Sequence, residues 1–488
     1  MRKILLVSTA MLLSGCTVGP DFKTPEAPSA QGYTAEGQPA PTASAATPLG
    51  QAQHFDPRQD IQADWWALFK SPALNSLIEH ALAANPTIDS AQAALRQARE
   101  LVRAQQGAYY PQVSGGLSAS RNLTPTASLS PASASGNPYY SLITAQLSVS
   151  YTPDVFGLNR RTVETLAAQA EMQRFQLEAT YLTLTSNVVA AAVQEASLRG
   201  QIEATAETVR IEAHLTDILR QQSALGQATR GDVAAQEAAL AQAQQALPPL
   251  QKQLAVQRDL LTALAGRLPN EEIAEHFNLA DFQLPTEIPL TLPSTLVEHR
   301  PDIRAALETL HAASAQVGVA IANRLPQFTL SATGGSQPNS IGNLFTPGTG
   351  FWTLAGGLTQ PIFDAGTLQH RQYAAQAGFD QAAAEYRSTV ISALQNVADS
   401  LRALQYDADA LTAAVASERA AALSLEIAKR QLQLGAVPYL ALLNAEQTYQ
   451  TSRLSLVQAQ AGRLADTAAL FQALGGGWWN RTEAPPAD

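Results

Sequence analysis

Two long segments of the chain place apolar residues at coiled-coil spacing. In the first, apolar positions recur at intervals of three, four or seven: Leu177, Tyr181, Leu184, Val188, Ala191, Leu198 and Ile202. The second has the same pattern at Val390, Leu394, Val397, Leu401, Leu404, Ala408, Leu411 and Val415. Such a pattern is typical of helices packed along a coiled-coil seam. No proline lies within 154–247 or 362–437, so we predict uninterrupted helices over about 158–223 and 366–433.

Each predicted long helix ends at a Leu-Gly pair. Gly226 and Gly435 stand where a helix commonly takes a left-handed cap, a conformation that glycine adopts without steric cost. A shorter helix is expected after each turn, over about 232–265 and 439–474. The Pro-Pro pair at 248–249 should kink or break the first of these near its middle. The sequence therefore predicts two helical hairpins.

The two halves of the chain are related by an internal duplication. Residues 86–111 match 301–326, and both the opening and the closing prolines are offset by 215. Further along, four residues match four others at a constant offset of 209: Gly157, Asn187, Gly226 and Glu237 against Gly366, Asn396, Gly435 and Glu446. This period is far longer than that of a solenoid. We predict a first repeat over 61–270, an equatorial linker over 271–300, a second repeat over 301–474 and a C-terminal tail over 475–488.

Between the repeated prolines and the long helices, the pattern changes to a period of two. Apolar Ile143, Ala145, Leu147 and Val149 alternate with polar residues, which predicts a strand. Strands are expected at about 112–121, 140–152, 327–335 and 351–360. Ten residues suffice for a tilted transmembrane strand, although edge hairpins of a soluble domain would show the same pattern. Four strands cannot close a barrel, so membrane-spanning strands would require several chains to share one.

The N-terminus has the layout of a secretory signal. A basic start is followed by an apolar run and small residues, which predicts a signal peptide over 1–15. The stretch LSGC resembles a lipoprotein processing site in which Cys16, the only cysteine, would be acylated; an ordinary signal with a chance cysteine is the alternative. Such lipoproteins use aspartate after the cysteine for retention in the inner membrane; because Thr17 stands there in this chain, the resemblance points to the outer membrane. Residues 16–60 are rich in Pro, Ala, Thr and Ser, which predicts an extended, lipid-anchored tether.

Composition and motifs exclude several classes of function. A net charge of −10 over 488 residues argues against a nucleic-acid partner. The seven histidines are scattered, one cysteine allows no intramolecular disulfide, and neither a phosphate-binding loop nor a nucleophile-elbow motif is present. We therefore predict no enzyme activity, no cofactor and no metal site.

Several motifs together resemble the outer-membrane factors, the TolC-like channels of tripartite efflux pumps, and within them the lipoprotein branch that serves resistance-nodulation-division exporters. They are CTVGPDF after the lipid site, DWWALF, PALNSLIEHALAANP, QPIFDAG, LGAVPYLALLNAEQ and ALGGGWW. The resemblance implies an α+β membrane protein of two tandem repeats. Its homotrimer would form a 12-stranded outer-membrane β-barrel, continuous with a long periplasmic α-helical coiled-coil barrel. The implied partners are a periplasmic adaptor and a proton-driven inner-membrane pump.

In such channels the implied gate lies at the helix turns. By resemblance, Leu440 and Asn444 fall where the family places a hydrophobic ring and a carboxylate ring, so Asn444 departs from the pattern. Asp232 could supply acidic charge instead, and Tyr439 accompanies Leu440. The alternative is that Leu440 packs between helices and Asp232 caps one. A protein-secretion duct and a pore-less coiled coil remain rival functions, and the exported compound is not predicted because the pump selects it.

Overall fold

The computed structural model describes residues 17–30, 32–37, 39–123 and 139–481. The predicted signal peptide and Cys16 lie outside these residues. The chain divides into two compact units. The first, here called the strand unit, contains Ala94–Gln173 and Ala306–Tyr386 together with the residues up to Pro25. The second, the turn unit, contains Glu26–Ala93, Arg174–Ala305 and the residues from Arg387 onward. Each unit takes segments from both predicted repeats, so neither repeat is a compact domain by itself.

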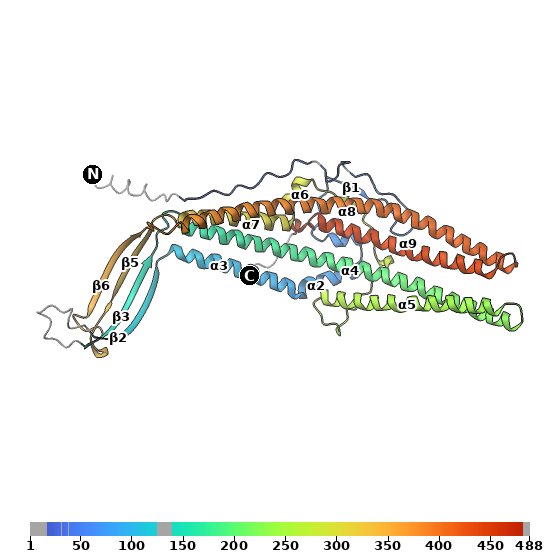
Figure 1. The fold of residues 1–488 in the computed structure, drawn as a ribbon, viewed down its shortest axis with the longest axis horizontal. Coiled ribbons are helices and arrows are strands. Elements are labelled where there is room, and N and C mark those ends of the chain that lie inside the picture. Colours follow the sequence, from blue (N-terminus) through green and yellow to red (C-terminus); the bar gives the residue numbers. More distant parts are fainter. Residues whose placement is uncertain (1–16, 31, 38, 124–138, 482–488) are drawn as a thin grey trace. The chain divides into compact units, whose positions relative to one another are not determined.

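The strand unit contains one four-stranded antiparallel sheet (Figure 1). Its order is β2 (Gln112–Leu123), β3 (Tyr139–Tyr151), β5 (Gln327–Ser336) and β6 (Gly350–Thr359). All four strands lie within two residues of the predicted bounds. The pairing of β3 with β5, for example Leu147 with Gly334, joins the two repeats. In this single chain β2 and β6 each have one unpaired edge.

Apolar side chains of the sheet are exposed at alternate positions, including Val113, Leu117, Leu147, Trp352, Leu354 and Leu358. Side chains two or four residues apart in a strand lie on the same face of the sheet. The exposed apolar residues of each strand therefore lie on one apolar face. A water-exposed sheet face of this kind requires a covering partner or lipid.

Eight α-helices are assigned among the described residues: α2 (Pro72–Ala84), α3 (Pro86–Gln106), α4 (Leu158–Ala224), α5 (Arg230–Leu264), α6 (Pro293–His299), α7 (Pro301–Ala322), α8 (Thr367–Gln433) and α9 (Tyr439–Ala473). The long helices α4 and α8 have 67 residues each and end within one residue of the prediction. None of the helices in the described residues combines the length and the apolar character needed to cross a membrane.

The helix α5 continues through Pro248 and Pro249, so of the predicted kink or break, the break is wrong. Both prolines are exposed. Proline removes backbone N–H donors, and on an exposed face water can bond to the carbonyls that lose them. The loss of these backbone hydrogen bonds therefore does not end the helix.

Short elements complete the turn unit. The strands β1 (His54–Asp56) and β4 (Glu287–Pro289) pair in parallel. Five 3-10 turns are assigned among the described residues of the chain: Trp65–Phe69, Gly107–Tyr109, Leu279–Asp281, Ile341–Asn343 and Trp478–Asn480. Trp65 is fully buried and stacks on Phe471 of α9 with ring centroids 5.5 Å apart. These aromatic contacts form part of the core of the turn unit.

The segment predicted as an extended tether packs on the turn unit over part of its length. Arg463 of α9 is fully buried and donates hydrogen bonds to the Leu49 carbonyl (3.3 Å), Thr42 Oγ1 (3.1 Å) and Gln53 Oε1 (3.0 Å). A buried guanidinium requires such acceptors. Residues 42–53 supply acceptors for both of its terminal nitrogens, which fixes this part of the segment on the turn unit.

Candidate functional site at the two helix turns

The turns between α4 and α5 and between α8 and α9 have the same backbone geometry. Gly226 and Gly435 adopt φ values of 75° and 69°, in the left-handed region. In the first turn Gln227 N donates to the Gln222 carbonyl at 2.8 Å, and in the second Ala436 N donates to the Gln431 carbonyl at 2.9 Å. Both are Schellman caps, in which glycine is the residue that avoids a steric penalty. The duplicated Leu-Gly pair therefore builds two equivalent turns.

After the turns the two hairpins differ. In the first, Thr229 and Asp232 form a capping box: Asp232 N donates to Thr229 Oγ1 (3.1 Å) and Thr229 N donates to Asp232 Oδ2 (3.0 Å). The hydrogen bonds from Thr229 lower the pKa of Asp232. Asp232 is thus engaged as a helix cap, which was the alternative to its role as a gating charge.

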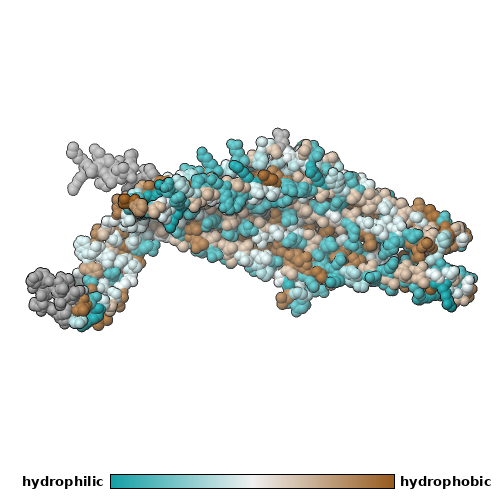
Figure 2. Space-filling model, viewed as in Figure 1, coloured by the Kyte–Doolittle hydropathy of each residue, from teal (hydrophilic) through white to brown (hydrophobic). Residues whose placement is uncertain are grey.

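In the second hairpin, α9 begins at Tyr439 after Pro438. The Leu440 side chain is 64% exposed, and Asn444 is exposed one helical turn later on the same face. Leu440 is therefore not packed between helices of its own chain. Figure 2 shows hydrophobic surface over the α8–α9 turn and more hydrophilic surface over the α4–α5 turn. The exposed leucine and asparagine are available to face a neighbouring surface or an open passage.

Tyr439 does not share this exposure. Its hydroxyl donates a hydrogen bond to Gln236 Oε1 of α5, across 203 residues of sequence. Burial, together with repulsion from Glu446, raises the pKa of Tyr439, so the hydroxyl remains a donor. Gln236 is fully buried and donates from Nε2 to the Glu212 carbonyl at 3.0 Å and to Glu212 Oε2 at 2.5 Å. Tyr439 thus connects the two hairpins.

Sequence reasoning missed Gln236 and Glu212 as site residues. The duplication did mark Glu446 as the counterpart of Glu237, but the pattern gave no sign that the two would differ. Glu237 is exposed and forms an ion pair with Arg220 at 2.8 Å. Glu446 is buried, and burial together with repulsion from Glu212 raises its pKa to about 7. The local period alone does not indicate which copy is buried.

A family model described as outer membrane efflux protein matches residues 77–267 and 292–476, more than half of the chain. The chain belongs to this family. The toluene efflux pump outer membrane protein TtgC of Pseudomonas putida is 30% identical over 482 residues, or 98% of this chain and 96% of the relative. The cation efflux system protein CusC of Escherichia coli is 27% identical over 491 residues, or 98% and 99% of the two chains.

Solved structures give the same assignment for the fold of this outer membrane efflux protein. The outer-membrane channel OprN matches with a TM-score of 0.84 and 26% identity, covering 95% of this chain and all of that one. The open state of the Neisseria gonorrhoeae MtrE channel matches with a TM-score of 0.81 and 25% identity, over 96% and 100%. The predicted family is confirmed, and the fold is that of outer-membrane efflux channels.

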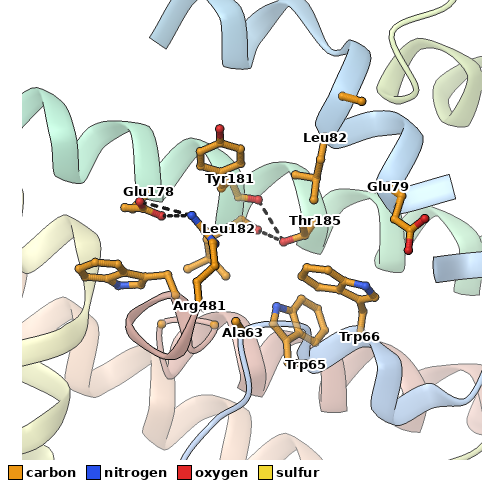
Figure 3. Close-up of a pocket in the computed structure, with 14 residues that line it drawn as sticks. Ala63, Trp65, Trp66, Glu79, Leu82, Glu178, Tyr181, Leu182, Thr185 and Arg481 are labelled. Carbon is orange, nitrogen blue, oxygen red and sulfur yellow. Dashed lines mark hydrogen bonds and ion pairs between the residues drawn. The ribbon is translucent and has the colours of Figure 1, made fainter. Parts of the chain in front are cut away.

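The turn unit of this efflux protein also contains a cavity of about 460 Å³ (Figure 3). Its lining is largely aromatic and apolar, with Trp65, Trp66 and Tyr181. The Arg481 guanidinium reaches Glu178 at 3.1 Å and lies over the Tyr181 ring. Burial raises the pKa of Glu178, against the attraction of Arg481. Glu178 and Arg481 therefore neutralise each other's charge. Such an ion pair stabilises the turn unit rather than leaving a charged group free in the cavity.

Metal ligands do not gather at the described sites. Among residues 17–30, 32–37, 39–123 and 139–481, no group of three or more His, Cys, Asp or Glu side chains is placed to hold a metal ion. The relatives bear the names of efflux components, and membership in a channel family agrees with the prediction that the chain is not an enzyme.

The segment that follows Cys16 docks on the strand unit. Arg161 of α4 has a nearly buried side chain and donates to the Val18 carbonyl (3.1 Å), the Gly19 carbonyl (3.3 Å) and Asp21 Oδ1 (2.8 Å). Phe22 stacks on His311 of α7, with ring centroids 4.5 Å apart. These contacts hold residues 17–22 against α4 and α7.

Replacing Arg161 with Met should release this segment. Hydrogen bonds from a charged donor contribute about 1.5 to 3 kcal/mol each, so losing them should raise local opening by about tenfold or more. Trypsin should then cut after Lys23 faster, as measured by the appearance of Thr24 as a new N-terminus. Arg324→Met removes an exposed arginine of the same unit and should leave the rate unchanged. Equal rates in the two variants would show that Arg161 does not hold the segment.

Proposed function

We propose that this chain is the outer-membrane duct of a tripartite efflux system, and that three copies close one twelve-stranded barrel. The observation that carries the proposal is the four-stranded sheet with two unpaired edges, β2 and β6. Unpaired backbone groups are too costly in lipid, and joining the edge of one copy to the next removes them. The exposed apolar positions of the strands would then face the membrane.

The long helices provide the periplasmic part of the duct. A helix of 67 residues rises about 100 Å, which is enough to extend far from the membrane. The family model matches 77–267 and 292–476, which supports repeats over 61–270 and 301–474 joined by the linker 271–300. Three copies would contribute six hairpins to one helical tube.

We place the gate at the hairpin turns. Exposed Leu440 and Asn444 would form an apolar and an amide ring around the axis of the trimer, where side chains restrict passage. Gly226 and Gly435 shape the turns, Tyr439 ties the second hairpin to the first, and Asp232 caps α5. The transported molecules pass through the duct passively, without any chemical step or cofactor.

The partners and location follow from the same proposal. An adaptor would join the turns to an inner-membrane pump of the resistance-nodulation-division class, and acylated Cys16 would anchor the mature chain in the outer membrane. Relatives are named for toluene, cation and pyoverdine export. Since similar ducts serve such different compounds, we assign the choice of compound to the pump.

Conductance of the purified full chain in planar bilayers tests the proposal. Discrete single-channel steps and a mass of three chains per particle are expected. Expression with its adaptor and pump should also restore drug tolerance to cells that lack an outer-membrane channel. Absence of conductance from trimeric, folded protein would favour a pore-less coiled coil, and export of a folded or unfolded protein without drug tolerance would favour a secretion duct.

A further inference from the structure

An acidic pair lies between the two hairpins, close to the turns. Glu446 on α9 is 6% exposed, and neither of its oxygens receives a hydrogen bond from a donor among the described residues. The equally buried Glu212 on α4 lies against it and repels its charge. Buried carboxylates are normally paired with a cation or with donors. Two adjacent ones without a bound cation are stable together only if they share a proton.

The remaining groups around the pair bridge the hairpins. The chain of hydrogen bonds from Tyr439 through Gln236 to Glu212 joins α9 to α5 and α4. The charged or titratable groups that act on this cluster are Glu212 from α4, Asp232 from α5, Lys429 from α8 and Tyr439 from α9. Lys429 attracts Glu446, but this effect is smaller than those of burial and of Glu212.

The duplication shows that this arrangement is specific to the second hairpin. The offset of 209 relates Arg220 and Glu237 to Lys429 and Glu446. In the first hairpin the pair closes on itself, since Arg220 Nη2 lies 2.8 Å from Glu237 Oε1 and both side chains are about half exposed. In the second hairpin, Glu446 instead faces Glu212 of the first hairpin.

We propose that Glu212 and Glu446 form a proton-dependent latch that holds the two hairpins together. With one proton between them, one carboxyl donates a hydrogen bond to the other, and the Tyr439–Gln236–Glu212 chain is complete. When the proton leaves to periplasmic water, two adjacent carboxylates remain in a buried space and repel each other. The hairpins then separate near their turns. This goes beyond the duct function, because it concerns the association of the hairpins and not what passes between them.

The direction of the pH dependence follows from the closed state. Burial and repulsion from Glu212 raise the pKa of Glu446 to about 7, whereas a separated carboxyl has its ordinary value of about 4.3. Between these values the closed state holds a proton that the open state has released. The latch is therefore strongest at a pH below about 4.3. As the pH rises from there to about 7, the equilibrium constant for closing falls by at most about tenfold per pH unit, because one proton is involved.

Hydrogen exchange of the full-length trimer tests the latch without requiring a conducting channel. Peptides covering 230–240 and 439–446 are compared at about pH 5 and about pH 8, after correction for the intrinsic pH dependence of exchange. The native protein should exchange at least about tenfold faster at the higher pH. Glu446→Gln keeps the shape and the neutral state, so its exchange should be slow at both values. Glu237→Gln removes the exposed counterpart and should behave as the native protein.

Each outcome of this experiment supports or overturns the latch. Equal corrected exchange in the native protein at both pH values would overturn it, as would a pH dependence that persists in Glu446→Gln. A protein that conducts normally but shows no such exchange difference would retain the duct function and lose the latch. If divalent cations slowed exchange at high pH only while Glu446 is present, the pair would bind a cation rather than share a proton, and the proton latch would be rejected.

Discussion

Replacing Arg258 with Met is expected to lower the free energy of unfolding by about 3 kcal/mol, because it removes several charged hydrogen bonds and leaves the buried Glu195 carboxylate with Arg199 as its remaining partner. Arg258 lies on α5 and pairs with Glu272 and with the fully buried Glu195, at 3.0 Å from Nη1. It also donates to His276 Nδ1 at 2.7 Å and to the Ile273 carbonyl at 2.9 Å. Methionine retains the apolar stem and removes every one of these donors.

Chemical denaturation followed by the helical circular-dichroism signal measures the effect. Arg210→Met is the matched control, since Arg210 is an exposed arginine of α4 that pairs with Glu207 on its own helix. Exposed pairs of this kind contribute little, so the control should unfold as the native protein does. If both variants unfold at the same denaturant concentration, the buried cluster does not stabilise the linker against α4 and α5.

Replacing Leu440 with Ala is expected to raise single-channel conductance by about twofold or more and to lengthen the open periods. A ring of leucines can close a passage both by its size and by expelling water, and shorter side chains weaken both effects. Leu440 is exposed at the start of α9 and is not part of the hydrophobic cluster formed there by described residues of the same chain. The substitution should therefore leave folding and formation of the proposed trimer intact.

Leu225→Ala provides the comparison at the other turn. Leu225 is an exposed leucine beside Gly226, outside the proposed ring. Its substitution should leave conductance unchanged in the absence of an adaptor. A Leu440→Ala channel that conducts like the native one would move the constriction away from this residue, while leaving the duct itself in place.

Much of the architecture could be predicted from local patterns. The 3.5-residue period identified α4 and α8, and the Leu-Gly pairs identified both turns, because glycine is the residue that adopts a left-handed cap without strain. The period of two identified the four strands to within two residues. These signals succeed because each arises from contacts within one or two turns of the chain.

Two features depend on tertiary packing and could not be predicted from the local pattern. Residues 42–53 lack an apolar period, yet Arg463 binds them from about 410 to 421 residues away. The Pro-Pro pair at 248–249 lies on an exposed face of α5, where the lost hydrogen bonds do not end the helix. Composition alone distinguishes neither a docked segment from a free one nor an exposed proline from a buried one.

In this protein, the local spacing of apolar residues and glycines is enough to predict the duplicated plan of strands, long helices and Leu-Gly turns. How equivalent positions of the two repeats are used depends instead on contacts that form only in the folded chain. Glu237 and Glu446 occupy the same place in the two repeats, but one meets Arg220 in solvent and the other meets Glu212 in a buried space. The difference arises from the packing of α9 beside α4 and α5. Burial raises the free energy of a charged carboxylate strongly, and the local sequence does not indicate which carboxylate is buried.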